Sequence, residues 1–384
     1  MTDSSKFDLI VYGATGFTGR LICEHLNATY GVKQDINWAM AGRSQSKLEQ
    51  VRNELGFDST VELLVADTND MASLNKLVST TKTLISAVGP YQKYGSDVIK
   101  ACAENGTDYV DLSGEPTWMR EMIGEYNATA KSSGARIVFS CGFDSIPFDM
   151  GTYFLQQTAQ EKLGGPVCRV KCRIRNMNGM ASGGTVASFI ATMAAAEKSP
   201  ELNDVLANPF ALTEGFTGPE QPPGDKTIFE DDINSWSGPF IMATINTKNI
   251  HRSNFLLDHQ YGEDFVYDEM ALLGSGEKPE QPTESMNFDM SLKPGEGPSK
   301  EQRDAGFYDI VFYGTASDGQ TIQVSVKGDL DPGYGSTSKI IAEAAICLLQ
   351  NTDTSGGCLT SAPAMGAPLI ERLQSKAGLI FTVE

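Results

Sequence analysis

The sequence predicts an α/β protein with an N-terminal doubly wound parallel sheet of the Rossmann type and a second α+β domain that has a mainly antiparallel sheet. Three observations lead to this prediction. A short apolar run at 7–12 leads directly into the glycine-rich segment GATGFTG at 13–19. Short apolar runs then alternate with helical patterns to about residue 150. Strict two-residue alternation follows at 168–175.

The glycine-rich segment predicts a dinucleotide site. Gly13 permits the tight turn after the strand, Gly16 lets the backbone approach a pyrophosphate, and Gly19 lets the helix of about 19–29 lie close to the sheet. Free N–H groups at the positive end of that helix stabilise a diphosphate by a few tenths to about 2 kcal/mol. The alternative is a glycine-rich turn without a ligand. The expected cofactor contacts are Gly13, Ala14, Thr15, Gly16, Phe17, Thr18 and Gly19.

The second predicted strand, 36–44, indicates which dinucleotide binds. A site that prefers NAD carries Asp or Glu near the end of this strand, and no acidic residue occurs between Ile36 and Ser44. Arg43 stands there instead, with Ser44 as a candidate N-cap and Lys47 one turn into the next helix. A guanidinium suits a 2′-phosphate, so we predict NADP(H) with these three residues at the phosphate. The alternative is an ordinary surface arginine.

Four further strands are expected at 61–66, 83–88, 109–112 and 137–140, with helices at 71–79, 96–105 and 116–132. Parallel strands place their carboxyl ends at one edge, so the loops at 13–19, 43–47, 67–68, 88–95, 111–115 and 141–149 should share one cleft. Asp67 and Thr68 are expected beside the adenine. The expected contacts near the nicotinamide are Val88, Gly89 and Pro90.

A change of pattern after residue 150 predicts a substrate or dimerisation domain at 151–335, with 336–384 completing the first domain. In CRVKCRIR at 168–175 four cations alternate with cysteine or aliphatic residues, which predicts a strand with one solvated face. These cations could bind an acidic substrate, but we favour a solvated face or a subunit contact. Further expected elements are an apolar helix ending near Lys198, long loops with a few strands such as 240–244 between 200 and 298, a hairpin at 308–327, and helices at 336–350 and 364–376.

Composition excludes several classes of protein. The net charge of −19 argues against nucleic acid as a partner, because phosphate backbones need clustered Lys and Arg. No apolar run reaches membrane-spanning length and residues 1–6 do not resemble a signal peptide, so we expect a cytoplasmic protein without an integral membrane segment. Seven scattered cysteines and only three histidines predict buried free thiols and no metal site. A homodimer through the second sheet is a further hypothesis.

Seven motifs together resemble the saccharopine dehydrogenase-like oxidoreductases, a family that includes bacterial trans-acting enoyl reductases. They are GATGFTG at 13–19, AGRS at 41–44, SAVGPYQKYG at 86–95, YVDLSGE at 109–115, CGFDSIPFD at 141–149, SGGT at 182–185 and GGCLTSAPAMG at 356–366. The resemblance covers nearly the whole chain outside 200–305. It implies NADP(H) binding and hydride transfer, and it does not fix the substrate.

A reductase needs a bound nicotinamide, an oriented acceptor and usually a proton donor. No tyrosine stands four residues before a lysine, which argues against the Tyr-x-x-x-Lys pair of short-chain dehydrogenases. Tyr91 is the first candidate donor and Tyr94 the second. Carboxyl groups with a raised pKa could orient an amine or relay a proton; the candidates are Asp111 with Glu115, and Asp144 with Asp149. The alternative is that Tyr91 packs on the cofactor and the aspartates cap helices.

These observations predict an NADP(H)-dependent oxidoreductase that acts on a C=C, C=N or C=O bond of a small or lipid-like substrate. The alternative is a non-catalytic NADP(H)-binding sensor or scaffold. Turnover distinguishes the two, because a sensor binds NADPH without oxidising it under any acceptor.

Overall fold

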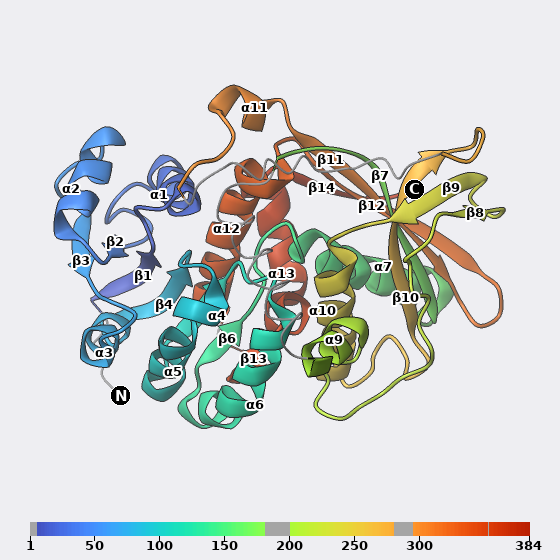
Figure 1. The fold of residues 1–384 in the computed structure, drawn as a ribbon, viewed down its shortest axis with the longest axis horizontal. Helices are drawn as coiled ribbons and strands as arrows, with labels where there is room; N and C mark the ends of the chain where they lie inside the picture. The colour runs from blue at the N-terminus through green and yellow to red at the C-terminus, as the bar shows by residue number, and fades with distance from the viewer. Residues whose placement is uncertain (1–5, 181–199, 280–294, 352) are drawn as a thin grey trace.

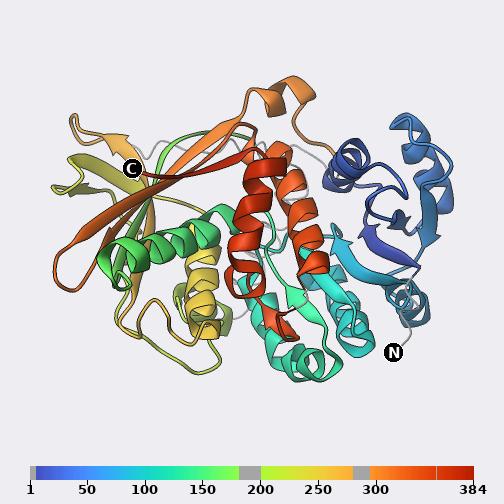
Figure 2. The same ribbon diagram turned by 180° about the vertical axis from the view of Figure 1, so that it is seen from behind.

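Two sheets stand at opposite ends of the molecule in the computed structural model, which describes residues 6–180, 200–279, 295–351 and 353–384 (Figure 1). Helices α12 (Thr337–Gln350) and α13 (Ser361–Lys376) lie between the sheets, as the view from behind shows (Figure 2). The predicted apolar helix that ends near Lys198 and the SGGT motif at 182–185 lie outside the described residues.

Sheet A is parallel throughout, and its spatial order β13-β6-β5-β4-β1-β2-β3 contains the strand order of a Rossmann fold. The six predicted strands are present, and a seventh, β13, pairs with β6 through Cys358 and Ile137. Three residues are too short to show a strand period, so β13 was not predicted. The strands are β1 (Phe7–Tyr12), β2 (Trp38–Gly42), β3 (Glu62–Val65), β4 (Thr81–Ser86), β5 (Asp108–Asp111), β6 (Arg136–Val138) and β13 (Gly357–Leu359).

Helices cover both faces of sheet A. Leu9 and Val11 of β1 pack in the core that includes α1 (Phe17–Tyr30), α2 (Gln45–Glu54) and α12. Ile10 of the same strand packs on the other side, in the core of α3, α5 and α6. The first core continues through α13 to sheet B, so the two halves of the molecule share it. The bounds of the second group are α3 (Met71–Val78), α5 (Ser96–Asn105) and α6 (Pro116–Ser133).

Sheet B has the order β14-β12-β11-β7-β10-β9-β8 and is antiparallel except for the parallel pair β7 and β10. The predicted hairpin is confirmed: β11 and β12 pair from Tyr308 with Gly328 to Thr315 with Thr321. Helix α7 (Ile146–Leu163) packs against β12. The strands are β7 (Arg169–Asn178), β8 (Ile228–Glu230), β9 (Ser235–Pro239), β10 (Val266–Gly274), β11 (Phe307–Thr315), β12 (Thr321–Gly328) and β14 (Leu379–Val383).

The C-terminal part of the chain contributes one strand to each sheet. β13 joins sheet A and β14 joins sheet B, although they are close in sequence. The boundaries at 150 and 336 therefore stay predictions.

The expected strand at 240–244 is wrong, because helix α10 (Ala243–Leu256) begins there. Two shorter helices, α9 (Pro200–Ala207) and α11 (Lys300–Asp304), also form in or beside the stretch expected to be mainly loops. The cause of the error is that α10 buries polar side chains on every side. Asn246, Lys248 and Arg252 are all at most 2% exposed, so the apolar period of an amphipathic helix is missing.

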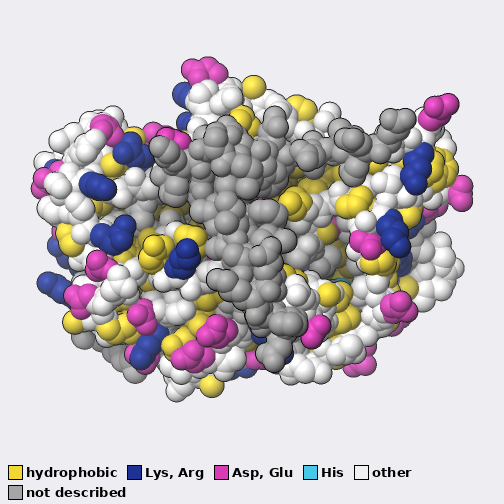
Figure 3. All heavy atoms as spheres, viewed as in Figure 1, with side chains coloured by type: hydrophobic (Ala, Val, Ile, Leu, Met, Phe, Trp, Pro, Cys, Tyr) yellow, Lys and Arg dark blue, Asp and Glu magenta, His cyan; other side chains and the backbone are white. Residues whose placement is uncertain are grey.

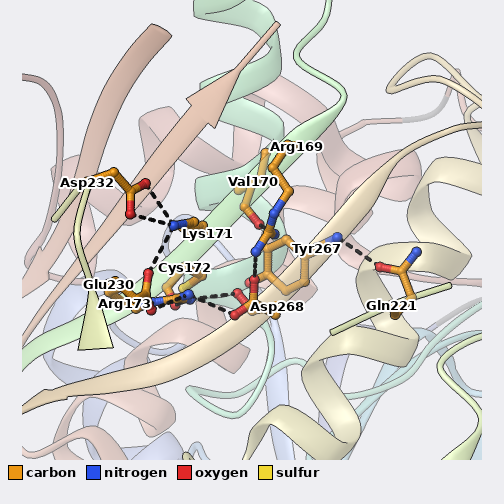
Figure 4. Close-up of polar contacts among 10 residues, drawn as sticks. All are labelled: Arg169, Val170, Lys171, Cys172, Arg173, Gln221, Glu230, Asp232, Tyr267 and Asp268. Atoms are coloured by element: carbon orange, nitrogen blue, oxygen red, sulfur yellow. Dashed lines mark hydrogen bonds and ion pairs between the residues drawn. The ribbon is translucent and has the colours of Figure 1, made fainter. Parts of the chain in front are cut away.

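The predicted alternation in β7 is present, but the cationic face is not simply solvated. Arg173 is only 1% exposed and lies 2.8 Å from both Glu230 and Asp268 (Figure 4). Acidic residues of neighbouring segments also pair with the other three cations of the row. The tertiary contacts thus neutralise the row, which leaves no free cationic surface for an acidic substrate. These pairs are Arg169 with Asp268, Lys171 with Glu230 and Asp232, and Arg175 with Asp309 and Glu384.

The surface shows no gathered basic patch on the part of one face that the structure describes. Lys and Arg side chains are scattered among Asp and Glu there (Figure 3). Within the described residues, every helix is too short or too polar to cross a membrane.

A buried ion-pair cluster fastens α1 to the two helices between the sheets. The Glu343 side chain of α12 has no exposed surface. Its carboxylate lies 2.8 Å from His25 Nε2, accepts a 2.8 Å hydrogen bond from Tyr30 and pairs with Arg372 of α13 at 2.9 Å. These partners hold the pKa of the Glu343 carboxyl below its ordinary value, although burial opposes them.

We expect Glu343→Ala to lower the free energy of unfolding by about 3 to 5 kcal/mol, because it leaves Arg372 without its buried counter-charge. Urea denaturation followed by circular dichroism measures this change. Asp304→Ala is the control: it removes an exposed ion pair with Lys300 and should cost no more than about 1 kcal/mol. Equal losses in the two variants would contradict the assignment of α1 docking to this cluster.

Candidate active site

A cavity of about 870 Å³ lies at the carboxyl edge of sheet A, where it is also lined by α9 and α10. Five of the six loops expected in one cleft contribute to it, and the loop at 67–68 does not. Gly333 and Tyr334, from a π-helical turn at Pro332–Ser336, close the cavity beside the glycine-rich segment. Asp331 holds this turn, since its carboxylate accepts hydrogen bonds from three successive backbone N–H groups.

The glycine-rich segment has the shape that a diphosphate needs. Gly13 adopts a left-handed φ of +91°, and a Cβ on Gly19 would lie 2.1 Å from the Gly13 carbonyl oxygen. Helix α1 begins after Gly16 without a side-chain cap and without an acidic residue in its first turn. Its first N–H groups are therefore available to an anion. Gly13, Thr15, Gly16, Phe17 and Thr18 line the cavity, whereas Ala14 and Gly19 lie behind it.

Arg43 lies where the 2′-phosphate of NADP(H) is expected. It follows β2, lines the cavity and is exposed, and no described residue forms a hydrogen bond or ion pair with its side chain. Tyr12 lies beside it at the end of β1. Burial and the nearby Asp67 raise the pKa of this phenol to about 12, although Arg43 opposes the shift. The Tyr12 hydroxyl, still protonated, donates to the Ala66 carbonyl at 3.2 Å.

The other residues predicted near the adenosine end do not line the cavity. Ser44 is the N-cap of α2, as expected, and accepts from the Lys47 backbone N–H at 3.4 Å. The Lys47 side chain is exposed. Asp67 accepts from the Asn69 backbone N–H, and Thr68 is buried. Cofactor contacts by these side chains stay predictions.

At the nicotinamide end, the loop after β4 is held by a carboxylate. Val88 and Gly89 line the cavity and Pro90 does not. A short helix, α4 (Tyr91–Tyr94), follows. The Glu115 carboxylate accepts from the backbone N–H groups of Tyr91 and Gln92 at 2.9 and 2.8 Å, so it caps this helix.

Neither candidate tyrosine presents a free hydroxyl to the cavity. Tyr91 lines the cavity, but its hydroxyl donates to the Ser86 carbonyl at 2.9 Å and accepts from the Leu112 N–H at 3.1 Å. Burial and the nearby Asp111 hold its pKa well above the ordinary value. Tyr94 is 36% exposed and lies outside the lining. A donor role for either residue stays a prediction, and these contacts weigh against Tyr91.

Asp111 joins the loops that follow β5 and β6. Its buried carboxylate accepts from the backbone N–H groups of Ser113 and Ser140 at 3.0 and 2.8 Å and from the Tyr109 hydroxyl at 3.0 Å. Burial raises the pKa of Asp111 to about 7, although these donors oppose the shift. Ser140 has a left-handed φ of +58°, which the bond to Asp111 helps to hold. Asp111 thus fixes the floor of the cavity.

The Asp149 carboxylate holds the start of α13. Its carboxylate accepts from the Ser361 hydroxyl at 2.6 Å and from the Ala362 backbone N–H at 2.9 Å, at the start of α13. Three of the four candidate carboxylates therefore hold backbone or helix termini.

Asp144 is different from the other three carboxylates. It lines the cavity and is partly buried, and no described residue donates a hydrogen bond to its side chain. Burial raises the pKa of this carboxyl to about 6, with no charged neighbour as a cause. A carboxylic acid of that pKa that lines a cavity is suited to donate a proton near neutral pH.

The wall opposite sheet A is largely apolar and was missed from the sequence. Among the described residues that line the cavity, the charged side chains are Arg43, Glu115 and Asp144. The apolar run at 240–243 was a usable signal, but it was assigned to a strand. The missed apolar lining residues of this wall are Leu206, Ala207, Ile241, Met242 and Ile245, with Thr244 and Asn203 beside them.

Comparisons with known proteins agree with this geometry. Residues 9–138 match the family model of the saccharopine dehydrogenase NADP binding domain. A Mycobacterium tuberculosis protein named as a trans-acting enoyl reductase is 35% identical, over 96% of this chain and 95% of its own length. The trans-acting enoyl reductase of Mycobacterium ulcerans is 33% identical, over 96% of each chain. Saccharopine dehydrogenase (L-Glu forming) of Saccharomyces cerevisiae shares the fold, with a TM-score of 0.54, 12% identity and coverage of 98% and 100%.

We expect Arg43→Ala to weaken NADPH binding by about ten- to a hundredfold, because a charge-assisted hydrogen bond contributes about 1.5 to 3 kcal/mol. NADH binding should change little, since NADH has no 2′-phosphate. Isothermal titration calorimetry measures both. Lys47→Ala is the matched control, because Lys47 is a nearby exposed cation outside the lining. Equal losses for both dinucleotides would remove the phosphate assignment.

Proposed function

This chain belongs to the saccharopine dehydrogenase-like oxidoreductases and binds NADP(H); from this premise we propose that it reduces a C=C bond conjugated to a carbonyl in an apolar acyl group. The observation that carries the proposal is the acceptor end of the cavity, where an apolar wall and the carboxyl group of Asp144 line the same space and no described residue donates a hydrogen bond to that carboxyl. Relatives named as enoyl reductases support C=C over C=N or C=O as the reacting bond.

In the proposed reaction the chain holds the acyl group and donates a proton to it. The glycine-rich segment and Arg43 would hold NADPH, which would supply a hydride to the β-carbon of the acyl group. The electron pair of the C=C bond then forms a C–H bond at the α-carbon with the proton of Asp144. The products are the saturated acyl group, NADP⁺ and the Asp144 carboxylate, which a solvent proton restores. The apolar wall excludes water while the proton is transferred.

The charges of the cavity argue against an amino acid or 2-oxo acid as the acceptor. Such molecules carry a carboxylate, which a site usually pairs with Arg or Lys. Arg43 is the cation of the described lining, and we assign it to the 2′-phosphate. The acceptor end then has two carboxyl groups, Glu115 and Asp144, and no cation among its described residues, so it disfavours an anion. An uncharged, lipid-like acyl group fits this end.

Two other expectations remain proposals. The seven cysteines are free, which supports a reducing compartment such as the cytoplasm. A homodimer through sheet B stays a hypothesis.

We expect Asp144→Asn to lower the turnover number at least about a hundredfold, which lies within the usual range for the loss of a general acid. NADPH affinity should stay unchanged, because Asp144 does not contact the glycine-rich segment. In the wild type, turnover should fall as pH rises through about 6, since the donor must be protonated and its pKa is raised to that value. The loss of NADPH absorbance with an α,β-unsaturated N-acetylcysteamine thioester measures both effects.

Tyr91→Phe separates the two candidate donors. It removes the hydroxyl bonds to Ser86 and Leu112 and leaves Asp144 in place. If Tyr91 were the donor, this variant would lose turnover and Asp144→Asn would retain it.

We also expect the KM for such thioesters to fall about fourfold for each added methylene until the apolar wall is filled, because burial of a CH₂ group contributes about 0.8 kcal/mol. A series of acyl chains of increasing length tests this in the same absorbance assay. Reduction of a 2-oxo acid with an amine is the counter-test. Faster NADPH oxidation with that pair than with any thioester would overturn the acyl assignment.

A further inference from the structure

Helix α10 places a buried polar pair behind Asp144. Asn246 and Asn249 are 0% and 1% exposed. Buried amides cost free energy unless they form hydrogen bonds, so their partners show what they hold.

The near end of this network is the residue after Asp144. The Asn249 side-chain N–H donates to the Ser145 hydroxyl oxygen at 2.6 Å. The Ser145 hydroxyl lies 2.6 Å from the Asp144 carbonyl oxygen and 3.3 Å from Asn246 Oδ1, and its single proton can bond to either acceptor. Ser145 is the N-cap residue of α7. The contacts of Asn246 and Asn249 with Ser145 therefore hold the turn that carries Asp144.

The far end of the network lies in the core of sheet B. Asn246 Nδ2 donates to Glu269 Oε2 at 3.0 Å, and the Tyr267 hydroxyl donates to Glu269 Oε1 at 2.8 Å. Glu269 and Tyr267 belong to β10 and are each 1% exposed. The hydrogen bonds therefore connect the second sheet to the backbone of Asp144 through α10.

The Asp144 carboxyl depends on its backbone for its direction. No described residue donates to it, so its rotamer is not fixed by a hydrogen bond from the part of the chain that the structure describes. The direction of such a side chain is set by the position of its backbone and by its packing. Movement of the turn by even about 1 Å would displace the acid from the reacting carbon, which is costly for catalysis.

We infer that Asn246 and Asn249 are positioning residues that fix the Asp144–Ser145 turn and so hold the Asp144 carboxyl toward the acceptor end of the cavity. The catalytic meaning of this inference rests on the proposed role of Asp144 as proton donor. The pair itself does not touch the substrate.

The titratable groups around Asp144 come from several elements. Tyr91 and Glu115 share the cavity with it, and Arg43 lies at the far end of the same cavity. The buried groups on the elements behind the turn are Asp149 of α7, Lys248, His251 and Arg252 of α10, and Tyr267, Asp268 and Glu269 of β10. None of them is a cause of the raised pKa of Asp144, which follows from burial alone.

The test follows the Asp144 carboxyl itself, without turnover. Carbon-13 NMR of protein labelled at the aspartate carboxyl carbons gives its titration, and the signal is assigned by its loss in Asp144→Asn. The wild-type midpoint should lie near 6. In Asn249→Ala the freed carboxyl gains water or donors, so the midpoint should fall by at least about one pH unit toward the ordinary aspartate value. Turnover with the thioester should fall at least about tenfold, as expected for a displaced general acid.

Asn254→Ala is the matched control. Asn254 is a buried asparagine of the same helix, but it bonds to Gly262 and Tyr261 and not to the Asp144 turn. Its loss should reduce stability and leave the midpoint in place. An unchanged midpoint in folded Asn249→Ala would overturn the inference, as would an equal shift in Asn254→Ala.

An exchange of the amide and the carboxyl across the Asn246–Glu269 bond keeps the test informative if Asn249→Ala does not fold. Asn246→Asp places two carboxyl groups against each other and should shift the midpoint. The double variant Asn246→Asp with Glu269→Gln restores one donor and one acceptor at that bond, so the midpoint should return to the wild-type value. Equal midpoints in the single and double variants would overturn the inference. Full turnover in Asp144→Asn would instead remove the proposed proton donor, while the NMR titration would still decide the positioning.

Discussion

The Asp111 carboxylate is the constraint on which the cavity depends. It lies at the end of β5 and has no exposed surface. It accepts hydrogen bonds from backbone N–H groups of the loops after β5 and β6. Burial of a carboxylate is costly, and these donors offset the cost. The same hydrogen bonds fix the distance between the two loops. Glu115, on the β5 loop, then fixes the loop after β4. The floor of the site is thus one connected set of carboxylate-to-backbone bonds.

This arrangement explains why most acidic residues of the motifs cannot serve in proton transfer. A carboxylate that accepts two or three backbone N–H groups is occupied by structure, and the loss of those bonds would release a loop. No residue that the structure describes donates to Asp144 in this way, although it lies in the same cluster of loops. Its neighbours are held firmly while its carboxyl has no donor among the described residues, which is the condition that the proposed general acid requires.

The parallel sheet and the cofactor loop were predictable from the sequence because their signals are local. Six strands of sheet A show apolar runs, and the glycine spacing sits between a strand and a helix. Asp144 was among the predicted candidates because it follows the sixth strand. Tyr91 is the first candidate from the sequence because it follows the fourth strand, where the nicotinamide is expected. The contact of its hydroxyl with the Ser86 carbonyl depends on how the loop folds back, which the sequence does not show. β13 and α10 were not predictable, since the first is too short to show a period and the second buries Asn, Lys and Arg.

The free carboxyl of Asp144 also has a consequence for stability. Its pKa in the folded chain is raised to about 6, whereas the unfolded chain has the ordinary aspartate value. The folded chain therefore binds more protons between these two values, and stability falls as pH rises through that window. At pH values below the ordinary aspartate pKa, Asp144 does not lower the free energy of unfolding. Above about pH 6 it lowers that free energy by its full amount. A hydrogen-bond donor beside Asp144 would remove this cost and would also occupy the carboxyl that the proposed proton transfer uses. The buried amides of α10 hold the turn without bonding to the carboxyl, so they stabilise the loop and leave its acid free.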